Sequence, residues 1–189
     1  MTSSHEVDGP VPAGRDPHAY DRLRRRVLWS MPSGLYVVGT RAEGRRNLMT
    51  ISWATQVALS PKLIGIGVES EAVTHQLLEA GRVFALSFLP RSQRAVVRRF
   101  AKPVTESFVD DDTGVGTMQG EAVHLATTGA PILDCAVSWL DCELRHVLAL
   151  GSHSWFVGEV VDCGESPGDT DATDSAVLRM EDTRMNYGG

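Results

Sequence analysis

The sequence predicts one mainly β domain with a few short α-helices, whose strands form a closed or nearly closed barrel. Runs of β-branched and aromatic residues recur between Gly, Pro and Asp turn signals, and about seven such runs read as strands. A two-residue turn, Gly151-Ser152, separates two of these runs and is typical of a β-hairpin. Barrels are a common way for such domains to remove exposed strand edges. A length of 189 residues suits one domain of ordinary size.

The composition of the chain excludes several classes of function. The chain has 18 basic and 24 acidic residues, a net charge of −6, which argues against a nucleic-acid groove lined by Lys and Arg. The longest charge-free stretch, residues 47–61, is too short and too polar to span a bilayer, and the N-terminus has no apolar signal core. The cysteines are odd in number and have no metal-ligand spacing. We therefore expect a reduced, cytoplasmic protein without a metal site; the cysteines are Cys135, Cys142 and Cys163.

The first half of the chain begins with residues 1–17, which are rich in Pro, Gly, Ser and charge and predict a flexible arm before a domain at 18–189. Residues 21–29 have the spacing of a short amphipathic helix, in which the arginines form the solvated face, with a phosphate-binding patch as the alternative. Pro32-Ser33-Gly34 ends this helix, and a Glu-Gly pair predicts a hairpin turn. The strands expected in this half are residues 35–40, 48–60 and 62–69.

The second half predicts a helix over residues 71–80, capped by Ser70 and closed by Gly81. Pro90 is expected to open another helix that reaches Phe100. The acidic, glycine-rich stretch 105–130 is interpreted as a long loop, with a short helix as the alternative. The strands expected in this half are residues 82–89, 132–150, 153–163 and one within 177–189, with a polar loop at 164–175.

Two short patterns point to a ligand surface. Gly65 and Gly67 share one face of a strand, so a ligand or a neighbouring backbone is expected to lie close to that face. Thr50 and Ser52 also alternate along a strand, and their hydroxyls could bond the pyrimidine edge or the ribityl chain of a flavin. Taken alone, that pair is better explained by β propensity or surface position. The usual hydrolase, zinc-protease, phosphate-loop and dinucleotide motifs do not occur.

Six segments together resemble the flavin reductase-like family, the FMN-binding split barrels, over roughly residues 20–161 and onward to the end. In chain order the segments are MPSGLYVVGT, NLMTISWATQVALSPKLIGIGVE, SEAVTHQLLEAGRVFALSFL, RRFA, GAPILDCAVSWLDCEL and GSHSWFVGEV. The resemblance implies a split β-barrel with Greek-key-like connections. It also implies a homodimer that binds FMN, in some members FAD, at the interface.

Site residues follow from the resemblance by position. Thr50 and Ser52 would bond the flavin ring edge or ribityl chain, and His153 would lie by the nicotinamide or the isoalloxazine. The ribityl phosphate would lie at a helix N-terminus, which favours an anion. The residues that would line the flavin are Asn47, Leu48, Met49, Thr50, Ile51, Ser52 and Trp53; those at the phosphate are Ser70, Thr74 and His75; and Arg99 and Phe100 would be near the cofactor.

The implied activity is that of an NAD(P)H-dependent flavin reductase, with NADH or NADPH as reductant. The nicotinamide would pass a hydride to the flavin, and the protein would hold the two rings about 3–3.5 Å apart. Donors aimed at the reduced ring would stabilise its negative charge. Reduced flavin would then serve a partner such as a two-component monooxygenase.

Three other interpretations stay open. The protein could hold FMN permanently, as an electron carrier or as an oxidoreductase that acts directly on an organic substrate. It could be a non-catalytic barrel that binds another flat ligand. It could bind haem, for which His75 and His153 are the candidate axial ligands.

Overall fold

The computed structural model describes residues 7, 9–165 and 177–183. The chain forms two compact units, residues 1–32 with 185–189 and residues 33–184. The expected arm at 1–17 lies partly outside the described residues. The described part of the chain contains no helix of the length and apolarity that crossing a bilayer requires.

The first unit contains helix α1 (Pro17–Trp29), so the amphipathic helix expected at 21–29 is confirmed and begins earlier. Asp16 caps it, because its carboxylate accepts a hydrogen bond from the Ala19 amide at 2.7 Å, and Pro17 occupies the first helical position. The arginines form its solvated side, and no residue of the helix is buried.

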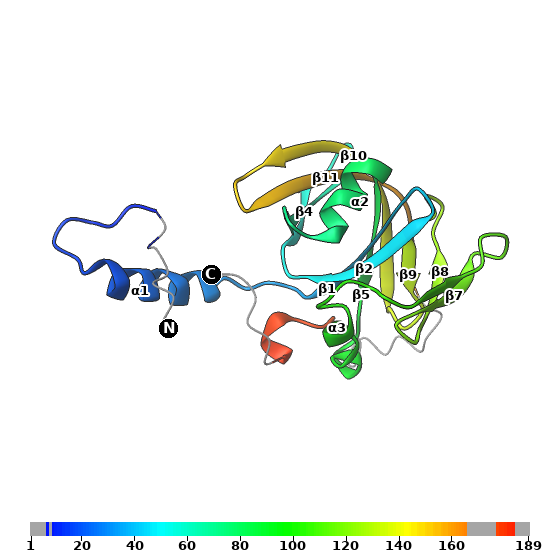
Figure 1. The fold of residues 1–189 in the computed structure, drawn as a ribbon, viewed down its shortest axis with the longest axis horizontal. Helices are drawn as coiled ribbons and strands as arrows, with labels where there is room; N and C mark the ends of the chain where they lie inside the picture. Colours follow the sequence, from blue (N-terminus) through cyan, green and yellow to red (C-terminus); the bar gives the residue numbers. More distant parts are fainter. Residues whose placement is uncertain (1–6, 8, 166–176, 184–189) are drawn as a thin grey trace. The chain divides into compact units, whose positions relative to one another are not determined.

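The second unit is mainly β, as expected, and its largest element is a seven-stranded antiparallel sheet with the order β2-β1-β5-β10-β11-β4-β3 (Figure 1). The hairpin predicted around Gly151-Ser152 is confirmed as the pair β10–β11. The strands are β1 (Tyr36–Ala42), β2 (Arg45–Ile51), β3 (Ala54–Ala58), β4 (Leu63–Glu69), β5 (Val83–Phe88), β10 (Ser138–Ala149) and β11 (His153–Glu165).

The two outermost strands of this sheet, β2 and β3, are consecutive in the chain and are separated only by Ser52 and Trp53. Three Cα–Cα steps span at most about 11 Å, so the sheet must curl until its two edges come together. The interior of the curl is apolar and includes Val38, Ile66, Phe84 and Phe156, all fully buried. The Ser52-Trp53 connection therefore lies where the two edges meet.

A second, four-stranded sheet corrects the expectation of a long loop at 105–130. The turn between β7 and β8 is made by Gln119 and Gly120, both with positive φ, as two-residue hairpin turns require. This sheet packs on the first, since a Cβ added to Gly39 of β1 would lie 1.9 Å from the Pro131 carbonyl oxygen. The strands are β6 (Ser107–Val109), β7 (Val115–Met118), β8 (Glu121–Leu125) and β9 (Pro131–Leu133), in that spatial order.

Two further expectations about strands and helices are corrected. The strand expected at 132–150 is two strands, β9 and β10, because a turn follows Leu133 and the Ala136 amide bonds its carbonyl. The helix expected from Pro90 to Phe100 is a 3₁₀ turn, η1 (Arg91–Gln93), followed by the short α3 (Val96–Arg99).

At the C-terminal end, the expected strand is reduced to isolated bridges at Val177 and Arg179 and the turn η2 (Met180–Asp182). Residues 184–189 of that predicted strand, and 166–176, which hold most of the predicted polar loop, lie outside the described residues.

Helix α2 (Val73–Gly81) is confirmed, but its termini differ from the expectation. Its N-cap is Ala72, without a side-chain hydrogen bond, and Arg82 in the left-handed conformation ends it. Gly81 is required for packing, since an added Cβ would lie 1.7 Å from the Arg41 carbonyl oxygen. Helix α2 contacts β1, β2 and β4, and thus covers the sheet where the two edges approach each other (Figure 1).

Candidate functional site

The glycine face of β4 is covered by two tryptophans of this chain. A Cβ added to Gly65 would lie 2.4 Å from Trp155 Nε1, and one added to Gly67 would lie 2.9 Å from Trp53 Cε3. The close neighbour that the structure places at these glycines is a pair of indole rings instead of a backbone. The missing side chains let both rings lie directly on the strand.

His153 joins the two indoles to form what we call the aromatic platform: Trp53, His153 and Trp155. The rings of Trp53 and His153 have centroids 4.7 Å apart and are tilted by 46°. They come from segments 100 residues apart in sequence, and β11 brings them together by pairing with β4, where His153 stands opposite Glu69. Trp53 remains 42% exposed, so part of the platform is accessible to a flat ligand.

The turn before His153 is anchored by Ser70. The Ser70 hydroxyl donates to the Gly151 carbonyl at 3.3 Å, and its amide donates to the Ser152 carbonyl at 2.9 Å. The Ser152 hydroxyl lies 3.0 Å from His153 Nδ1. Ser70 thus does not cap α2, and instead fixes the hairpin that presents His153.

Asn47 and Thr74 are both buried and bond each other. Asn47 Nδ2 donates to the Thr74 hydroxyl at 2.8 Å, and the Val104 amide donates to Asn47 Oδ1 at 2.9 Å. These bonds hold α2 and the segment after α3 against β2. The side chains therefore use their hydrogen-bonding capacity inside the fold.

His75 is also buried, with 7% of its surface exposed. Its Nε2 lies 2.8 Å from the Ser154 hydroxyl, and its ring meets Phe156 edge to face at 5.0 Å. Glu79 approaches Nδ1 at 3.6 Å. His75 is thus held on three sides by neighbours from α2 and β11.

Thr50 and Ser52 do not share one strand face, because β2 ends at Ile51. The Thr50 hydroxyl donates to the Val97 carbonyl at 2.6 Å and its amide donates to the Phe100 carbonyl at 2.9 Å, so both donors serve the packing of α3. Ser52, which follows β2 and precedes Trp53 in the chain, has 9% of its surface exposed, and its hydroxyl makes no hydrogen bond to a described residue. It is the free donor of this pair.

The remaining predicted residues lie apart from the platform. Leu48, Ile51 and Phe100 are buried in apolar packing, and Met49 packs against the core. Arg99 is exposed and pairs with Glu121 at 2.7 Å, beside an open hollow of about 300 Å³ that Thr105, Glu106 and Gln119 also line.

The structure therefore divides the predicted set into three groups. In the first group, Trp53 and His153 come together. Ser52 precedes Trp53 in the chain, and Ser70 bonds the turn before His153. The group under α2 is Asn47, Thr74 and His75, and the group at α3 is Thr50, Arg99 and Phe100. Sequence reasoning missed Trp155, although Gly65 and Gly67, whose face it covers, were its signal.

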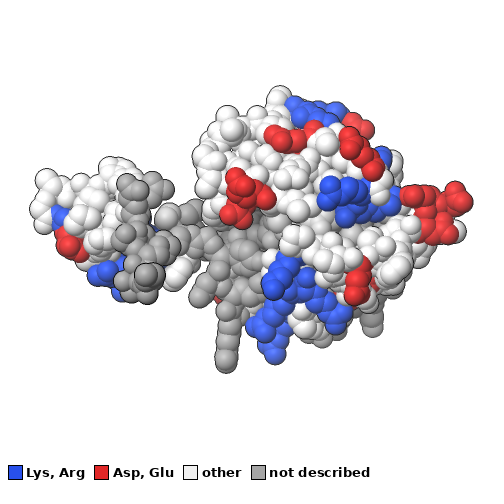
Figure 2. Space-filling model, in the orientation of Figure 1, with Lys and Arg blue, Asp and Glu red and all other residues white. Residues whose placement is uncertain are grey.

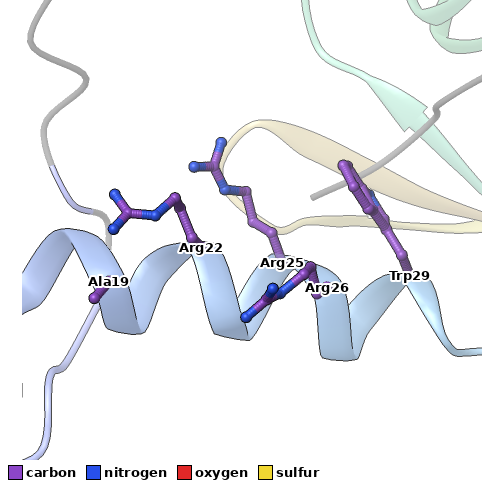
Figure 3. Close-up of a pocket in the computed structure, with 5 residues that line it drawn as sticks. All are labelled: Ala19, Arg22, Arg25, Arg26 and Trp29. Carbon is purple, nitrogen blue, oxygen red and sulfur yellow. The ribbon is translucent and has the colours of Figure 1, made fainter.

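A separate hollow of about 440 Å³ lies on α1, in the first compact unit. Figure 3 shows the side chains that line it on one helix: Ala19, Arg22, Arg25, Arg26 and Trp29. Arg25 pairs with Asp21 at 3.3 Å, whereas Arg22 and Arg26 have no carboxylate partner among the described residues. The arrangement fits the solvated face that the sequence predicted for this helix.

None of the described side chains forms a group of three or more His, Cys, Asp or Glu residues suited to a metal ion. The three cysteines are unpaired; burial raises the pKa of the Cys135 thiol to about 11 and that of Cys142 to about 12. Both thiols are therefore protonated at neutral pH and are poor nucleophiles.

Known proteins share this sequence pattern and fold. The flavin reductase like domain matches residues 28–186. An NADH-dependent FAD reductase from Streptomyces globisporus is 36% identical over 148 residues, 78% of each chain. A reductase component of a 4-nitrophenol monooxygenase from Rhodococcus opacus is 28% identical, over 76% of this chain and 72% of that protein.

A solved structure agrees with these sequence relatives. The NADH:FAD oxidoreductase of Streptomyces globisporus has a TM-score of 0.65 at 32% identity, covering 86% of this chain and 87% of that chain. The fold is thus that of a flavin reductase-like domain, and this chain is a member of the flavin reductase-like family.

Proposed function

We propose that the protein is an NADH-dependent flavin reductase that supplies reduced flavin to a partner enzyme. The observation that carries the proposal is the aromatic platform, where Trp53 and His153 lie 4.7 Å apart with one surface open to solvent. An exposed ring surface beside hydroxyls is what a flat, polar-edged ligand needs. The names of the Streptomyces and Rhodococcus relatives support the reductant, the flavin and a monooxygenase partner.

A flavin fits the platform by its shape and chemistry. The indoles of Trp53 and Trp155 lie against the glycines of β4 and offer apolar surface, while the Ser52 hydroxyl, on the residue before Trp53, would supply a donor. A nicotinamide beside a flavin supplies a hydride to it. FMN and FAD share the ring that this surface would contact, and the Streptomyces relative favours FAD as one substrate.

The residues of this chain would position and shield the reactants. Trp53 and Trp155 would exclude water from one side of the bound ring, which strengthens polar interactions there. Ser70 fixes the turn before His153, so the imidazole is held in place before a ligand arrives. Such prior positioning lowers the entropic barrier of a two-substrate reaction.

We extend the proposal to the architecture: the curled sheet is a split barrel that functions as a homodimer, with flavin at the interface. Its support is apolar exposure near the platform, where Val57 of the edge strand β3 and Leu148 and Leu150 of the β10–β11 hairpin are 45%, 58% and 58% exposed. A second copy would cover these residues and the platform together. Leu148→Glu is expected to shift sedimentation from dimer to monomer and to reduce flavin affinity.

We also assign the protein to the cytoplasm. Its three unpaired cysteines, one of them exposed at Cys163, suit a reducing compartment. Fractionation of the native host would check this, and recovery in a secreted or membrane fraction would contradict it.

The experiment for the activity is a visible spectrum of the purified protein with added FMN or FAD, followed by NADH without oxygen. Bleaching of the flavin band at a rate that depends on protein concentration is expected. His153→Ala should lower turnover by about tenfold, because a fixed polar contact to bound substrate is lost. Flavin affinity should change less.

The matched control for this variant is His18→Ala, on the exposed surface of α1. It should leave the rate unchanged. Equal losses of turnover and flavin affinity in His153→Ala would place His153 against the flavin instead of the nicotinamide, and absence of bleaching in the native protein would overturn the proposal.

A further inference from the structure

Five basic residues and no acidic residue occur between Pro90 and Lys102, in a chain whose net charge is −6. They are Arg91, Arg94, Arg98, Arg99 and Lys102. The segment contains η1 and α3, whose apolar side is buried through Val96, Val97 and Phe100. Every basic side chain is therefore on the outer side of the segment.

Only two of these charges are compensated by carboxylates in the described part of the chain. Arg91 pairs with Asp182 at 2.9 Å and Arg99 with Glu121 at 2.7 Å. The other three are exposed and have no carboxylate within 4.0 Å among residues 7, 9–165 and 177–183. We call Arg94, Arg98 and Lys102 the basic face; Figure 2 shows Lys and Arg side chains gathered in the region where α3 lies in Figure 1.

Uncompensated like charges at close spacing repel one another. Arg94 and Arg98 are only four residues apart in the chain and carry the same charge. The two carboxylates that reach this segment, those of Glu121 and Asp182, are already paired with Arg99 and Arg91. An acidic protein that keeps such a face unpaired has a local positive potential that attracts anions.

The basic face is attached to the strand that leads into the platform. Thr50 of β2 holds α3 by two hydrogen bonds, from its hydroxyl to Val97 and from its amide to Phe100. Trp53 follows three residues later, at most about 11 Å away along the chain. A nucleotide with its ring on the platform could thus extend its phosphates toward α3.

The alternative phosphate position, at α2, has less side-chain capacity. Thr74 accepts from Asn47 and is fully buried, and His75 faces Ser154 in the interior. Neither side chain points a free donor toward solvent. The basic face offers guanidinium groups, which match phosphate oxygens geometrically.

We propose that Arg94, Arg98 and Lys102 bind the phosphate groups of the nucleotide whose ring lies on the aromatic platform. This assignment rests on the proposed flavin reductase function and specifies which part of the substrate the enzyme recognises by charge. The phosphate-bearing substrate is the flavin nucleotide or the nicotinamide dinucleotide. The ring is then recognised by the β2–β3 connection and β11, and the phosphates by the segment that contains α3.

The test compares riboflavin, which has the same ring without phosphate, with FMN in the full-length protein. The double variant Arg94→Ser/Arg98→Ser should raise the KM for FMN about tenfold and leave the KM for riboflavin within about twofold, because charged hydrogen bonds to phosphate are lost. Arg22→Ser removes an exposed charge from α1 and serves as the control. It should change neither constant.

The two phosphate sources are separated by a second arm. With riboflavin as acceptor, a tenfold rise in the KM for NADH in the double variant would assign the face to the nicotinamide dinucleotide. A rise only for FMN would assign it to the flavin nucleotide. Equal changes for riboflavin and FMN with an unchanged KM for NADH, or no change for any substrate, would overturn the proposal.

Salt provides a measurement that needs no variant. In the native protein the KM of the phosphate-bearing substrate should rise with ionic strength, since exposed charges are screened beyond about 10 Å at 0.1 M salt. The KM for riboflavin should not change with ionic strength. If the native protein reduces riboflavin and FMN with equal KM values at every salt concentration, the flavin reductase proposal survives, but the basic face does not bind the flavin phosphate. If the KM for NADH is also independent of salt, the assignment of the basic face to any phosphate is overturned.

Discussion

Two histidines, one on helix α2 and one on strand β11, differ in what surrounds them. His75 on α2 is buried, with its Nε2 against the Ser154 hydroxyl and its ring against Phe156. His153 on β11 is half-buried, and its ring lies 4.7 Å from that of the exposed Trp53, tilted by 46°. The two residues His153 and Ser154 are adjacent in sequence, and their side chains point to opposite faces of the strand. One face supports the fold, and the other presents the platform.

The difference separates polar groups that are satisfied inside the fold from those that remain available to a ligand. The same difference distinguishes Thr50 from Ser52, since the Thr50 hydroxyl bonds the Val97 carbonyl whereas the Ser52 hydroxyl has no partner among the described residues. Substitutions on the inner side should change stability, and those on the outer side should change kinetics. The following experiments test that separation.

The largest effect is expected for His75→Ala. The variant loses the Ser154 contact and the edge contact with Phe156, and it leaves a cavity beside the core. We expect the free energy of unfolding to fall by about 3 kcal/mol in urea titrations. Lost turnover with unchanged stability would instead place His75 in the substrate site and remove the contrast with His153.

Trp53→Ala tests the outer side. The loss of a stacking surface should lower kcat/KM for flavin by roughly 30-fold, about 2 kcal/mol, because stacking on an aromatic side chain contributes about 1–3 kcal/mol. Trp53→Phe, which keeps a ring, should recover most of the activity. A drop in melting temperature that accounts for the whole activity loss would contradict the assignment of Trp53 to the ligand surface.

Thr50→Val and Ser52→Ala form a matched pair. Thr50→Val leaves the Val97 carbonyl without its partner in a buried position, so unfolding should become easier by about 1–2 kcal/mol. Ser52→Ala should stay within about 0.5 kcal/mol in stability and should weaken flavin binding. Chemical denaturation and flavin fluorescence titration measure the two quantities, and the reverse pattern would mean that Thr50 contacts the ligand.

The smallest effect concerns Asp141, a buried carboxylate that accepts two hydrogen bonds from Thr128, at 2.8 Å from its amide and 2.6 Å from its hydroxyl. Burial raises the pKa of this carboxyl above its usual value of 3.8. The folded state therefore binds the proton more tightly than the unfolded state, and stability decreases as the pH rises through the interval between the two pKa values. Asp141→Asn should remove this decrease, with a gain under about 1 kcal/mol at neutral pH.

Asp162, opposite Asp141 on β11, is the control for the sign. The hydroxyl of Thr127 donates to it at 2.6 Å and lowers its pKa. Its contribution to stability is thus present above the unfolded pKa and is lost as the pH falls. Stability curves between pH 3 and 8 should show opposite slopes for the two Asn variants relative to the native protein, and parallel slopes would contradict the difference in burial.

Much of the fold could be predicted from local patterns, and the exceptions have physical causes. The hairpin around Gly151 was predictable because a positive-φ glycine separates two long runs. The four-stranded sheet was missed because its strands have three to five residues and are interrupted by glycines and aspartates. Strands that short are stabilised by packing on β1 through the close approach at Gly39, which no local pattern shows.

The site was predictable in part. Trp53 and His153 were found through resemblance to a family, and the fold joins them because β11 pairs with β4. The commitment of Thr50 to α3 depends on a backbone carbonyl of Val97, which has no sequence signature. Trp155 was overlooked because alternating glycines indicate that something is close without saying what it is.

The fit between Gly65, Gly67 and the two indoles also restricts how this surface can change over evolution. A methyl group at Gly65 would enter the ring of Trp155, so even alanine there requires a smaller residue opposite it. Substitutions at Gly65 and Gly67 must therefore be coupled to substitutions at positions 53 and 155. A tryptophan must first be replaced by a smaller residue before the glycine beneath it can be replaced by a larger one. Homologues that carry bulkier residues on this strand should lack the tryptophans and should differ in the ligands that they accept.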